Sequence, residues 1–302
     1  MSADERPRFG TAGLPESFHA QGFKRSPQAP EYLQRFGLDA FEYQCGHGVR
    51  LPAATAAQLR EAAGARGIVL SLHAPYYISM ASPDAEKRAA SLRYLLQSAE
   101  AVKALGGSRV IFHPGGAGKQ PRADAMALAA ETLAAARAAL DAEGYGDICL
   151  CPETMGKLSQ LGALDEVLWL CRRDSRHIPC LDFGHLNARM QGALRTEQDF
   201  GAVLDAVAAA LPDARASRFH VHFSRIEYTA KGERRHLTFT DSQFGPPHQP
   251  FLQAVVRRGL QPVIICESAG TQAEDAKTMK DCYEKLIKKQ RRLERQEGDT
   301  PC

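Results

Sequence analysis

Short, almost continuously apolar runs recur along the chain and predict eight β-strands. They cover residues 8–13, 40–44, 68–75, 108–115, 147–154, 177–185, 217–224 and 261–268. Continuous rather than alternating hydrophobicity is typical of parallel strands, because such strands are buried on both faces. The pattern therefore favours an α/β protein with a parallel sheet.

Amphipathic stretches fill most of the gaps and predict helices. They cover residues 53–67, 88–107, 122–143, 162–174 and 197–210. Strand and helix alternate eight times, which predicts a (β/α)8 TIM barrel. The alternative is an open doubly wound sheet, but no GxGxxG motif follows the first strand. We expect one TIM-barrel domain over residues 1–302, with a core of about 8–285.

Composition changes this picture little. The 302 residues are 44% hydrophobic, which suffices for a sizeable core. The net charge of +3 neither favours nor excludes nucleic acid. No apolar stretch is long enough for a membrane span, and the polar start MSADERPRFG does not resemble a secretory signal, so we expect a cytoplasmic protein with no membrane partner.

Two further features bear on partners. The eight cysteines include no CxxC pair, so we interpret them as reduced residues, several in the core, rather than as a zinc-thiolate site. The chain from residue 277 onward is rich in Lys and Arg. Such a tail is typical of a solvated last helix, and contact with nucleic acid is the alternative.

Ionisable side chains stand at the C-terminal ends of six successive predicted strands. They are His73, His113, Glu153, Asp182, His185, His222 and Glu267. That edge of a TIM barrel carries catalysis, and burying so many ionisable groups is costly unless they are paired or bind metal. Imidazole and carboxylate ligands suit zinc, manganese or iron. With His236 the set exceeds the needs of one ion, so a cluster of two or three is expected.

The other histidines are less informative. His220 lies two residues before His222 and so faces the same side of its strand, deeper in the barrel. We expect it to support the site or to belong to the core. The remaining four lack a strand-end context and are interpreted as surface or loop residues: His19, His47, His177 and His248.

These motifs resemble the endonuclease IV family of apurinic/apyrimidinic (AP) endonucleases, in the xylose-isomerase-like TIM-barrel superfamily. The resemblance covers roughly residues 8–285. Its clearest segments are HAPYYI (73–78), FHPGG (112–116), PET (152–154), DFGH (182–185), HFS (222–224) and ES (267–268). It implies a metal-dependent hydrolase that cleaves DNA 5′ to abasic sites with two or three Zn²⁺ ions, Mn²⁺ being the alternative.

Carried over by motif, the resemblance implies three metal sites. His73, His113 and Glu153 would hold the first ion. Glu153 would bridge to a second ion, which also takes Asp182, His222 and Glu267; Glu153 and Glu267 are the candidate catalytic carboxylates. His185 and His236 would hold the third. Tyr76 and Tyr77 stand where the family inserts side chains into DNA.

The chain departs from the family at the third site. The family has Asp-x-His there, whereas Arg234 stands two residues before His236. Glu233 could substitute, or the site could be weak or empty. The main alternative function is a sugar isomerase or epimerase of the same superfamily, with one ion on Glu153, Asp182, His222 and Glu267 and a small sugar as substrate. The additional histidines favour the hydrolase over this alternative. A non-catalytic protein that binds nucleic acid or metal is a second alternative, and the near-complete ligand set argues against it.

Overall fold

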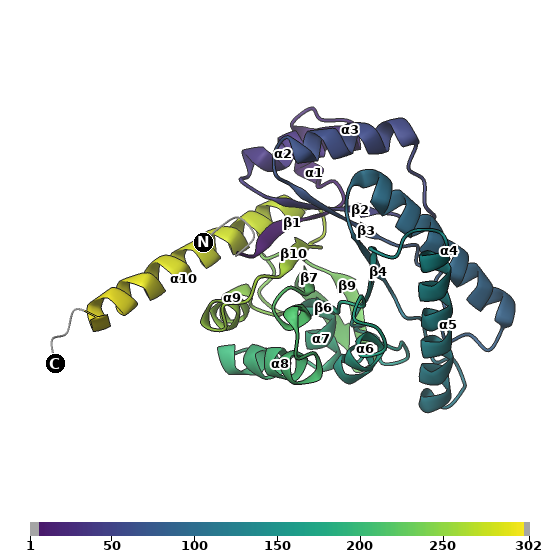
Figure 1. Ribbon diagram of the computed structural model, residues 1–302. Helices are drawn as coiled ribbons and strands as arrows, with labels where there is room; N and C mark the ends of the chain where they lie inside the picture. The colour runs from purple at the N-terminus through teal and green to yellow at the C-terminus, as the bar shows by residue number, and fades with distance from the viewer. Residues whose placement is uncertain (1–5, 299–302) are drawn as a thin grey trace.

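Eight parallel strands form a nearly closed barrel in the computed structural model, which describes residues 6–298 (Figure 1). The sheet order is β5-β4-β3-β2-β1-β10-β7-β6, and every neighbouring pair is parallel. The barrel strands are β1 (Arg8–Ala12), β2 (Ala40–Gln44), β3 (Val69–His73), β4 (Arg109–Phe112), β5 (Cys149–Pro152), β6 (Cys180–Asp182), β7 (His220–Phe223) and β10 (Val263–Cys266). The TIM barrel predicted from the sequence is confirmed.

The seam of the barrel lies between β5 and β6. Isolated parallel bridges join Leu150 to His177 and Glu153 to Cys180 there. The amide of Thr154 donates to the carbonyl of Cys180 at 3.0 Å. The seam is therefore closed around Glu153.

Helices lie outside the strands, and their apolar faces pack on the barrel (Figure 1). They are α1 (Glu16–Ala20), η2 (Ser26–Gln28), α2 (Ala29–Arg35), α3 (Ala53–Gly64), α4 (Ala85–Leu105), α5 (Arg122–Ala142), α6 (Leu164–Cys171), α7 (Phe183–Arg189), α8 (Glu197–Ala210), η3 (Ala214–Ala216), α9 (His248–Arg257) and α10 (Gln272–Gly298). None of the helices in the described part of the chain is long and apolar enough to cross a membrane.

Strand alternation separates two sets of side chains. Phe41, Leu72 and Val221 belong to the outer core between strands and helices. Their neighbours point the other way, because successive side chains of a strand face opposite sides. Glu42 of β2 lies 2.9 Å from His220 of β7, although these strands are not adjacent, so both side chains are inside the barrel. The interior thus contains polar groups below the strand ends.

The structure corrects three details of the sequence interpretation. The run 177–185 contains only a three-residue strand, and His185 lies in α7 rather than at a strand end. His177 lies in the loop between α6 and β6, but it is 1% exposed and so is not a surface residue. His236 ends β9 (Gly232–His236), which pairs with β8 (Ile226–Thr229) in a hairpin that the apolar pattern did not predict.

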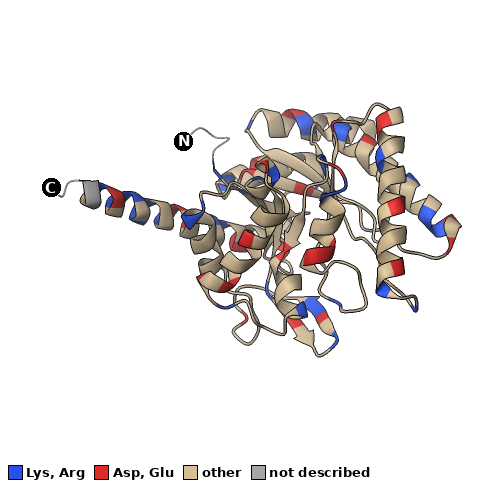
Figure 2. Cartoon of the chain, turned by 60° about the horizontal axis from the view of Figure 1, so that its bottom comes forward, with Lys and Arg blue, Asp and Glu red and all other residues tan. Residues whose placement is uncertain are grey.

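The basic tail continues α10 away from the barrel, and Figure 2 shows Lys and Arg repeated along it. The helix begins at Gln272, whose side chain donates to the carbonyl of Ala12 at the end of β1. Its 27 residues span about 40 Å at 1.5 Å per residue. The basic end therefore lies far from the strand ends where the site is found. Of the eight cysteines, Cys302 lies outside the described residues and the other seven are free thiols.

Candidate metal centre

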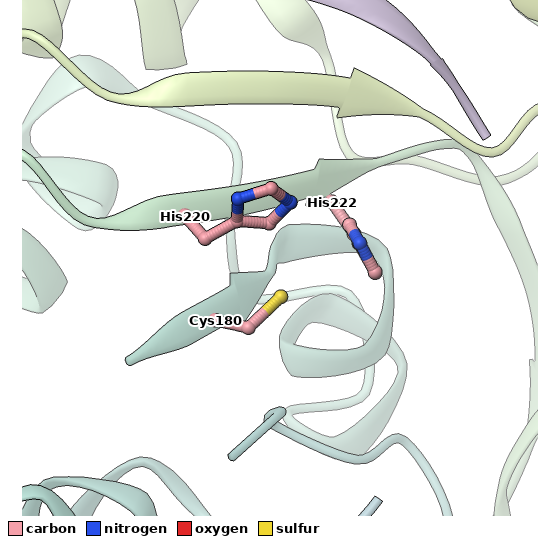
Figure 3. Close-up of side chains that lie close together, drawn as sticks. All are labelled: Cys180, His220 and His222. Carbon is pink, nitrogen blue, oxygen red and sulfur yellow. The ribbon is translucent and has the colours of Figure 1, made fainter. Parts of the chain in front are cut away.

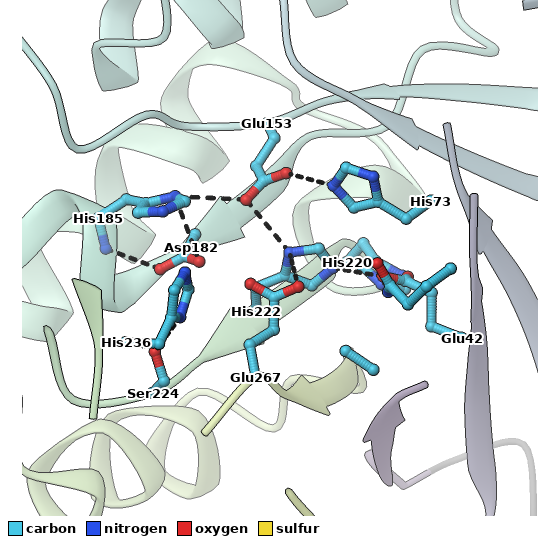
Figure 4. A network of polar contacts seen from close by, with 12 residues as sticks. Glu42, His73, Glu153, Asp182, His185, His220, His222, Ser224, His236 and Glu267 are labelled. Atoms are coloured by element: carbon cyan, nitrogen blue, oxygen red, sulfur yellow. Dashed lines mark hydrogen bonds and ion pairs between the residues drawn. The ribbon is translucent and has the colours of Figure 1, made fainter. Parts of the chain in front are cut away.

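Glu153 lies at the middle of a cluster of imidazole rings at the strand ends (Figure 4). Its Oε2 atom lies 3.2 Å from Nε2 of both His73 and His113. Its Oε1 atom lies 3.2 Å from Nδ1 of His222 and 3.3 Å from Nδ1 of His185. The two oxygens of one carboxylate thus face two different groups of histidines.

Two sets of ligand atoms share this carboxylate. His73, His113 and Glu153 form one set, in which the ligand atoms lie within 4.8 Å of one another. Glu153, Asp182, His222 and Glu267 form the other by the same measure. Such spacing is compatible with one ion in each set, with Glu153 between them.

The DFGH segment brings Asp182 and His185 together through a helix cap. Asp182 ends β6 and is the N-cap of α7, and its Oδ1 accepts from the amide of His185 at 2.7 Å. His185 therefore lies in the first turn of α7, with its ring beside the carboxylate. Gly184 lies between them because a Cβ there would come within 2.7 Å of the carbonyl oxygen of Ser224.

A β-bulge places Glu233 where the family motif predicts an aspartate. In the hairpin, Ile226 pairs with His236 and Glu227 with Arg235, but Tyr228 pairs with Glu233. Arg234 is thus the extra residue of the bulge. Because one residue is skipped, Glu233 and His236 lie on the same face despite their odd spacing.

Glu233 consequently reaches the histidines of the third predicted site. Its Oε2 lies 3.3 Å from Nε2 of His185, and the rings of His185 and His236 have centroids 5.5 Å apart. Two glycines make this approach feasible. A Cβ on Gly156 would lie 2.5 Å from the Cβ of Glu233, and one on Gly232 would lie 2.1 Å from the carbonyl oxygen of Gly156.

Burial and neighbouring charges shift the pKa values of the site residues in opposite directions. Burial would raise the pKa of Glu153, but the imidazoles of His222 and His113 hold it well below its usual range. Burial raises the pKa of Glu267, and the nearby Glu153 charge adds to this effect. Burial would lower the pKa of His185, but Asp182 and Glu153 raise it to about 10. Without metal, protonated imidazole therefore balances the carboxylates.

The donor set fits divalent metal ions. Asp182 Oδ2 and Glu233 Oε2 are buried atoms that make no hydrogen bond in the described structure, and the nearest cationic group to each is the ring of His185 at 3.3 Å. Buried carboxylate oxygens are costly unless a positive charge compensates them, and a bound cation would do so. Mixed imidazole and carboxylate donors suit zinc or manganese, and binding would displace protons from the histidines.

A cavity of about 470 Å³ opens over these residues. Tyr76, Lys157, Gln44, Gln160 and Gln272 are among its lining residues. Tyr76 is 54% exposed and stacks on the ring of His113, with 5.5 Å between centroids. Its neighbour on the same loop, Tyr77, packs near Tyr94 instead.

The search for ionisable residues at strand ends missed Glu42, which lies in the middle of β2 and is fully buried. Its Oε1 lies 2.9 Å from Nε2 of His222. The only sequence signal was a carboxylate inside an otherwise apolar strand, which is unusual for a buried position. His19 and His47 lie outside the cluster, as does His248, which stacks on Phe239.

A family model for xylose isomerase-like TIM barrels matches residues 30–288. The chain belongs to this family. It is 32% identical to an uncharacterized protein of Methanocaldococcus jannaschii, over 92% of this chain and 97% of that protein. A probable endonuclease 4 of Symbiobacterium thermophilum is 30% identical, over 61% of this chain and 69% of that protein.

Solved structures of two kinds share the fold. A D-tagatose 3-epimerase-like protein has a TM-score of 0.68 at 18% identity, covering 93% of this chain and 99% of that one. Endonuclease IV from Thermus thermophilus has a TM-score of 0.67 at 21% identity, covering 94% of this chain and 100% of that one. At these identities the likeness concerns the fold alone.

Proposed function

We propose that this protein is a metal-dependent phosphodiester hydrolase that resembles endonuclease IV and cleaves DNA 5′ to abasic sites with two or three zinc ions. The observation that carries the proposal is Glu153, whose two oxygens face separate histidine groups. One ion needs no such shared carboxylate, whereas a cluster does. The similarity to probable endonuclease 4 sequences supports the same choice.

The ligands divide into three groups. His73, His113 and Glu153 would hold the first ion, and Glu153, Asp182, His222 and Glu267 the second. His185, Glu233 and His236 would hold the third, with Glu233 in the place of the family's aspartate. Zinc ions in such a cluster supply Lewis-acid polarisation of a phosphodiester and a nucleophile at neutral pH. Mn²⁺ is compatible with the same donors.

The remaining cavity residues would bind and orient the substrate. Lys157, whose Nζ lies 3.8 Å from Glu233 Oε1, carries a cation to the rim where a phosphate would approach. Tyr76 stacks on His113 with about half its surface exposed. A duplex cannot enter the barrel, so an abasic nucleotide would be turned out and the exposed ring would fill the gap in the base stack.

A sugar epimerase is the second candidate. The set Glu153, Asp182, His222 and Glu267 alone could hold a single ion, and the epimerase-like structure shares the fold. The amides of Gln44, Gln160 and Gln272 line the cavity and could bind sugar hydroxyls. This candidate leaves the third group, with its bulge-positioned Glu233, without a role.

One experiment separates the two. Zinc-loaded protein is incubated with a duplex that carries a single abasic analogue, with and without chelator, and in parallel with ketohexoses. We expect a chelator-sensitive nick 5′ to the abasic position and no epimerised sugar. Epimerisation without nicking would replace the hydrolase by the second candidate.

A further inference from the structure

A second layer of polar side chains lies inside the barrel, directly beneath the candidate metal ligands. It contains Glu42, Ser71, Cys180 and His220, and all four are at most 4% exposed. The proposed reaction uses none of them. An ionisable group so far from water needs partners that stabilise its charge, so the contacts of Glu42 indicate what it does.

Glu42 has a polar group on every side. Nε2 of His222 lies 2.9 Å from Oε1, and Nε2 of His220 lies 2.9 Å from Oε2 (Figure 4). Ser71 donates its hydroxyl to Oε2 at 2.9 Å, and the side-chain amide of Gln44 donates to Oε1 at 3.1 Å. The Glu42 carboxylate is therefore held by four polar groups directly beneath the site, two of them imidazole nitrogens.

His222 differs from the other candidate ligands in the partner of its second nitrogen. Nδ1 of His73 lies 2.8 Å from the carbonyl oxygen of Ala74, and that of His185 lies 3.0 Å from the carbonyl oxygen of Thr154. Nδ1 of His236 lies 2.8 Å from the hydroxyl of Ser224. The partners of His73 and His236 are neutral, and Nδ1 of His185 also lies 3.3 Å from Oδ2 of Asp182, which is itself a candidate ligand. His222 instead faces the carboxylate of Glu42, which is not a candidate ligand. A carboxylate partner fixes the tautomer and makes the metal-facing nitrogen more basic.

We propose that Glu42 is the positioning residue of the metal centre, acting through His222. It keeps the proton of His222 on Nε2, so that the Nδ1 lone pair faces Glu153 and Glu267 at 3.2 and 3.5 Å. His220 holds the second carboxylate oxygen in place, with Nε2 at 2.9 Å from Oε2. This inference rests on the proposed function, because it requires a metal ion at His222.

His220 and His222 could alternatively hold a metal ion inside the barrel, together with Cys180. Cys180, His220 and His222 also have ligand atoms within 4.8 Å of one another. Figure 3 shows these three side chains from close by. An interior ion on these three would use a nitrogen of each histidine. Glu42 already faces Nε2 of both, at 2.9 Å, so this nitrogen of each ring is occupied by the carboxylate. The arrangement therefore favours Glu42 as the partner.

The test compares zinc affinity in parent protein, Glu42→Gln and Asp39→Asn. Asp39 is the matched control: it is also a buried carboxylate, at the start of β2, where it accepts from the amide of Phe9 and pairs with Lys280. Competition with a chromogenic chelator should show binding about 10- to 100-fold weaker in Glu42→Gln for the ion at His222, and unchanged in Asp39→Asn. Equal affinities in all three proteins would overturn the role of Glu42 alone. Failure of the parent to bind zinc would refute the proposed function as well.

A second measurement does not depend on any variant folding. Two-bond ¹H–¹⁵N NMR spectra of the zinc-loaded parent report which ring nitrogen of His222 carries the proton. We expect a protonated Nε2 and a metal-bound Nδ1. An unprotonated, metal-bound Nε2, with an ion that is lost in Cys180→Ala, would overturn the proposal in favour of the interior site.

Discussion

Gly156→Ala should weaken the third metal site and leave the other two intact. The backbone of Gly156 is not left-handed, so alanine can adopt it. The new Cβ would however lie 2.5 Å from the Cβ of Glu233, 2.7 Å from its Oε2 and 3.2 Å from Cδ2 of His185. Contacts under 3 Å force a shift, and Glu233 is the movable partner because its hairpin lies outside the barrel sheet.

The structure sets the size of the effect. Overpacking of this kind costs about 1–3 kcal/mol. If the strain is relieved by displacing the Glu233 carboxylate, the third ion loses that free energy of binding. This corresponds to roughly 5- to 150-fold weaker affinity. The three atoms nearest to the new Cβ belong to Glu233 and His185, which are not ligands of the first two ions, so those ions should be retained.

The assay is a zinc titration in chelator-buffered solution, with bound metal measured by elemental analysis at each free concentration. Gly64→Ala is the control, since a Cβ there meets no atom within 4 Å. It should bind metal as the parent does. If Gly156→Ala retained the weakest ion with parental affinity, Glu233 would not be the third-site ligand, and the argument from the bulge would be refuted.

Three further predictions follow from the same structure. Glu153→Gln should lose metal from both groups that the carboxylate joins, and with it activity, while circular dichroism still reports a folded barrel; full activity would remove the bridging assignment. Tyr76→Ala should weaken binding to abasic duplex by about 1–3 kcal/mol at fixed salt with metal content unchanged, and equal affinities would leave Tyr76 a rim residue that packs on His113. Burial lowers the pKa of His177 to about 4, below its unfolded value of about 6.5, so the unfolded chain binds the extra proton and stability falls as pH falls through this window. The free energy of unfolding of metal-free protein, measured with urea, should fall by about 3 kcal/mol between pH 7 and pH 4 because of this group, and His177→Gln should remove that contribution. An identical pH dependence of the two proteins would contradict this prediction.

The barrel could be predicted from the sequence because its strands are buried on both faces. Continuous apolar runs mark such strands, and the run 40–44 coincides with β2 (Ala40–Gln44). The run 177–185 was less informative, since buried strand and buried helix are both apolar. Asp182 ends the strand and caps α7, so the second half of that run is helical.

The candidate site could be predicted from the sequence where its residues stand at strand ends. His73, Glu153 and His222 stand directly after apolar positions, and the parallel arrangement brings them together. Glu42 was missed because its strand continues beyond it, so a search of strand ends passes over it. Its role depends on a contact across the barrel that no local pattern encodes.

The orientation of Glu233 could not be predicted from the sequence for a different reason. Its spacing from His236 is wrong for a regular strand, and only the bulge at Arg234 turns both side chains to the same face. A bulge depends on how the partner strand pairs, which the sequence of one strand does not reveal. The burial of His177 was not predicted for a related reason. It results from packing against α6, where Nδ1 lies 3.4 Å from the carbonyl oxygen of Leu170.

The proposed metal centre is a cluster of ions built around Glu153. Elemental analysis of protein purified without chelator and dialysed against metal-free buffer counts these ions directly. We predict two tightly held transition-metal ions per chain, and a third that is retained when free zinc is present in the buffer. A stable value of one ion, unchanged by added zinc, would contradict the cluster and favour single-metal sugar chemistry, and a value near zero would contradict both.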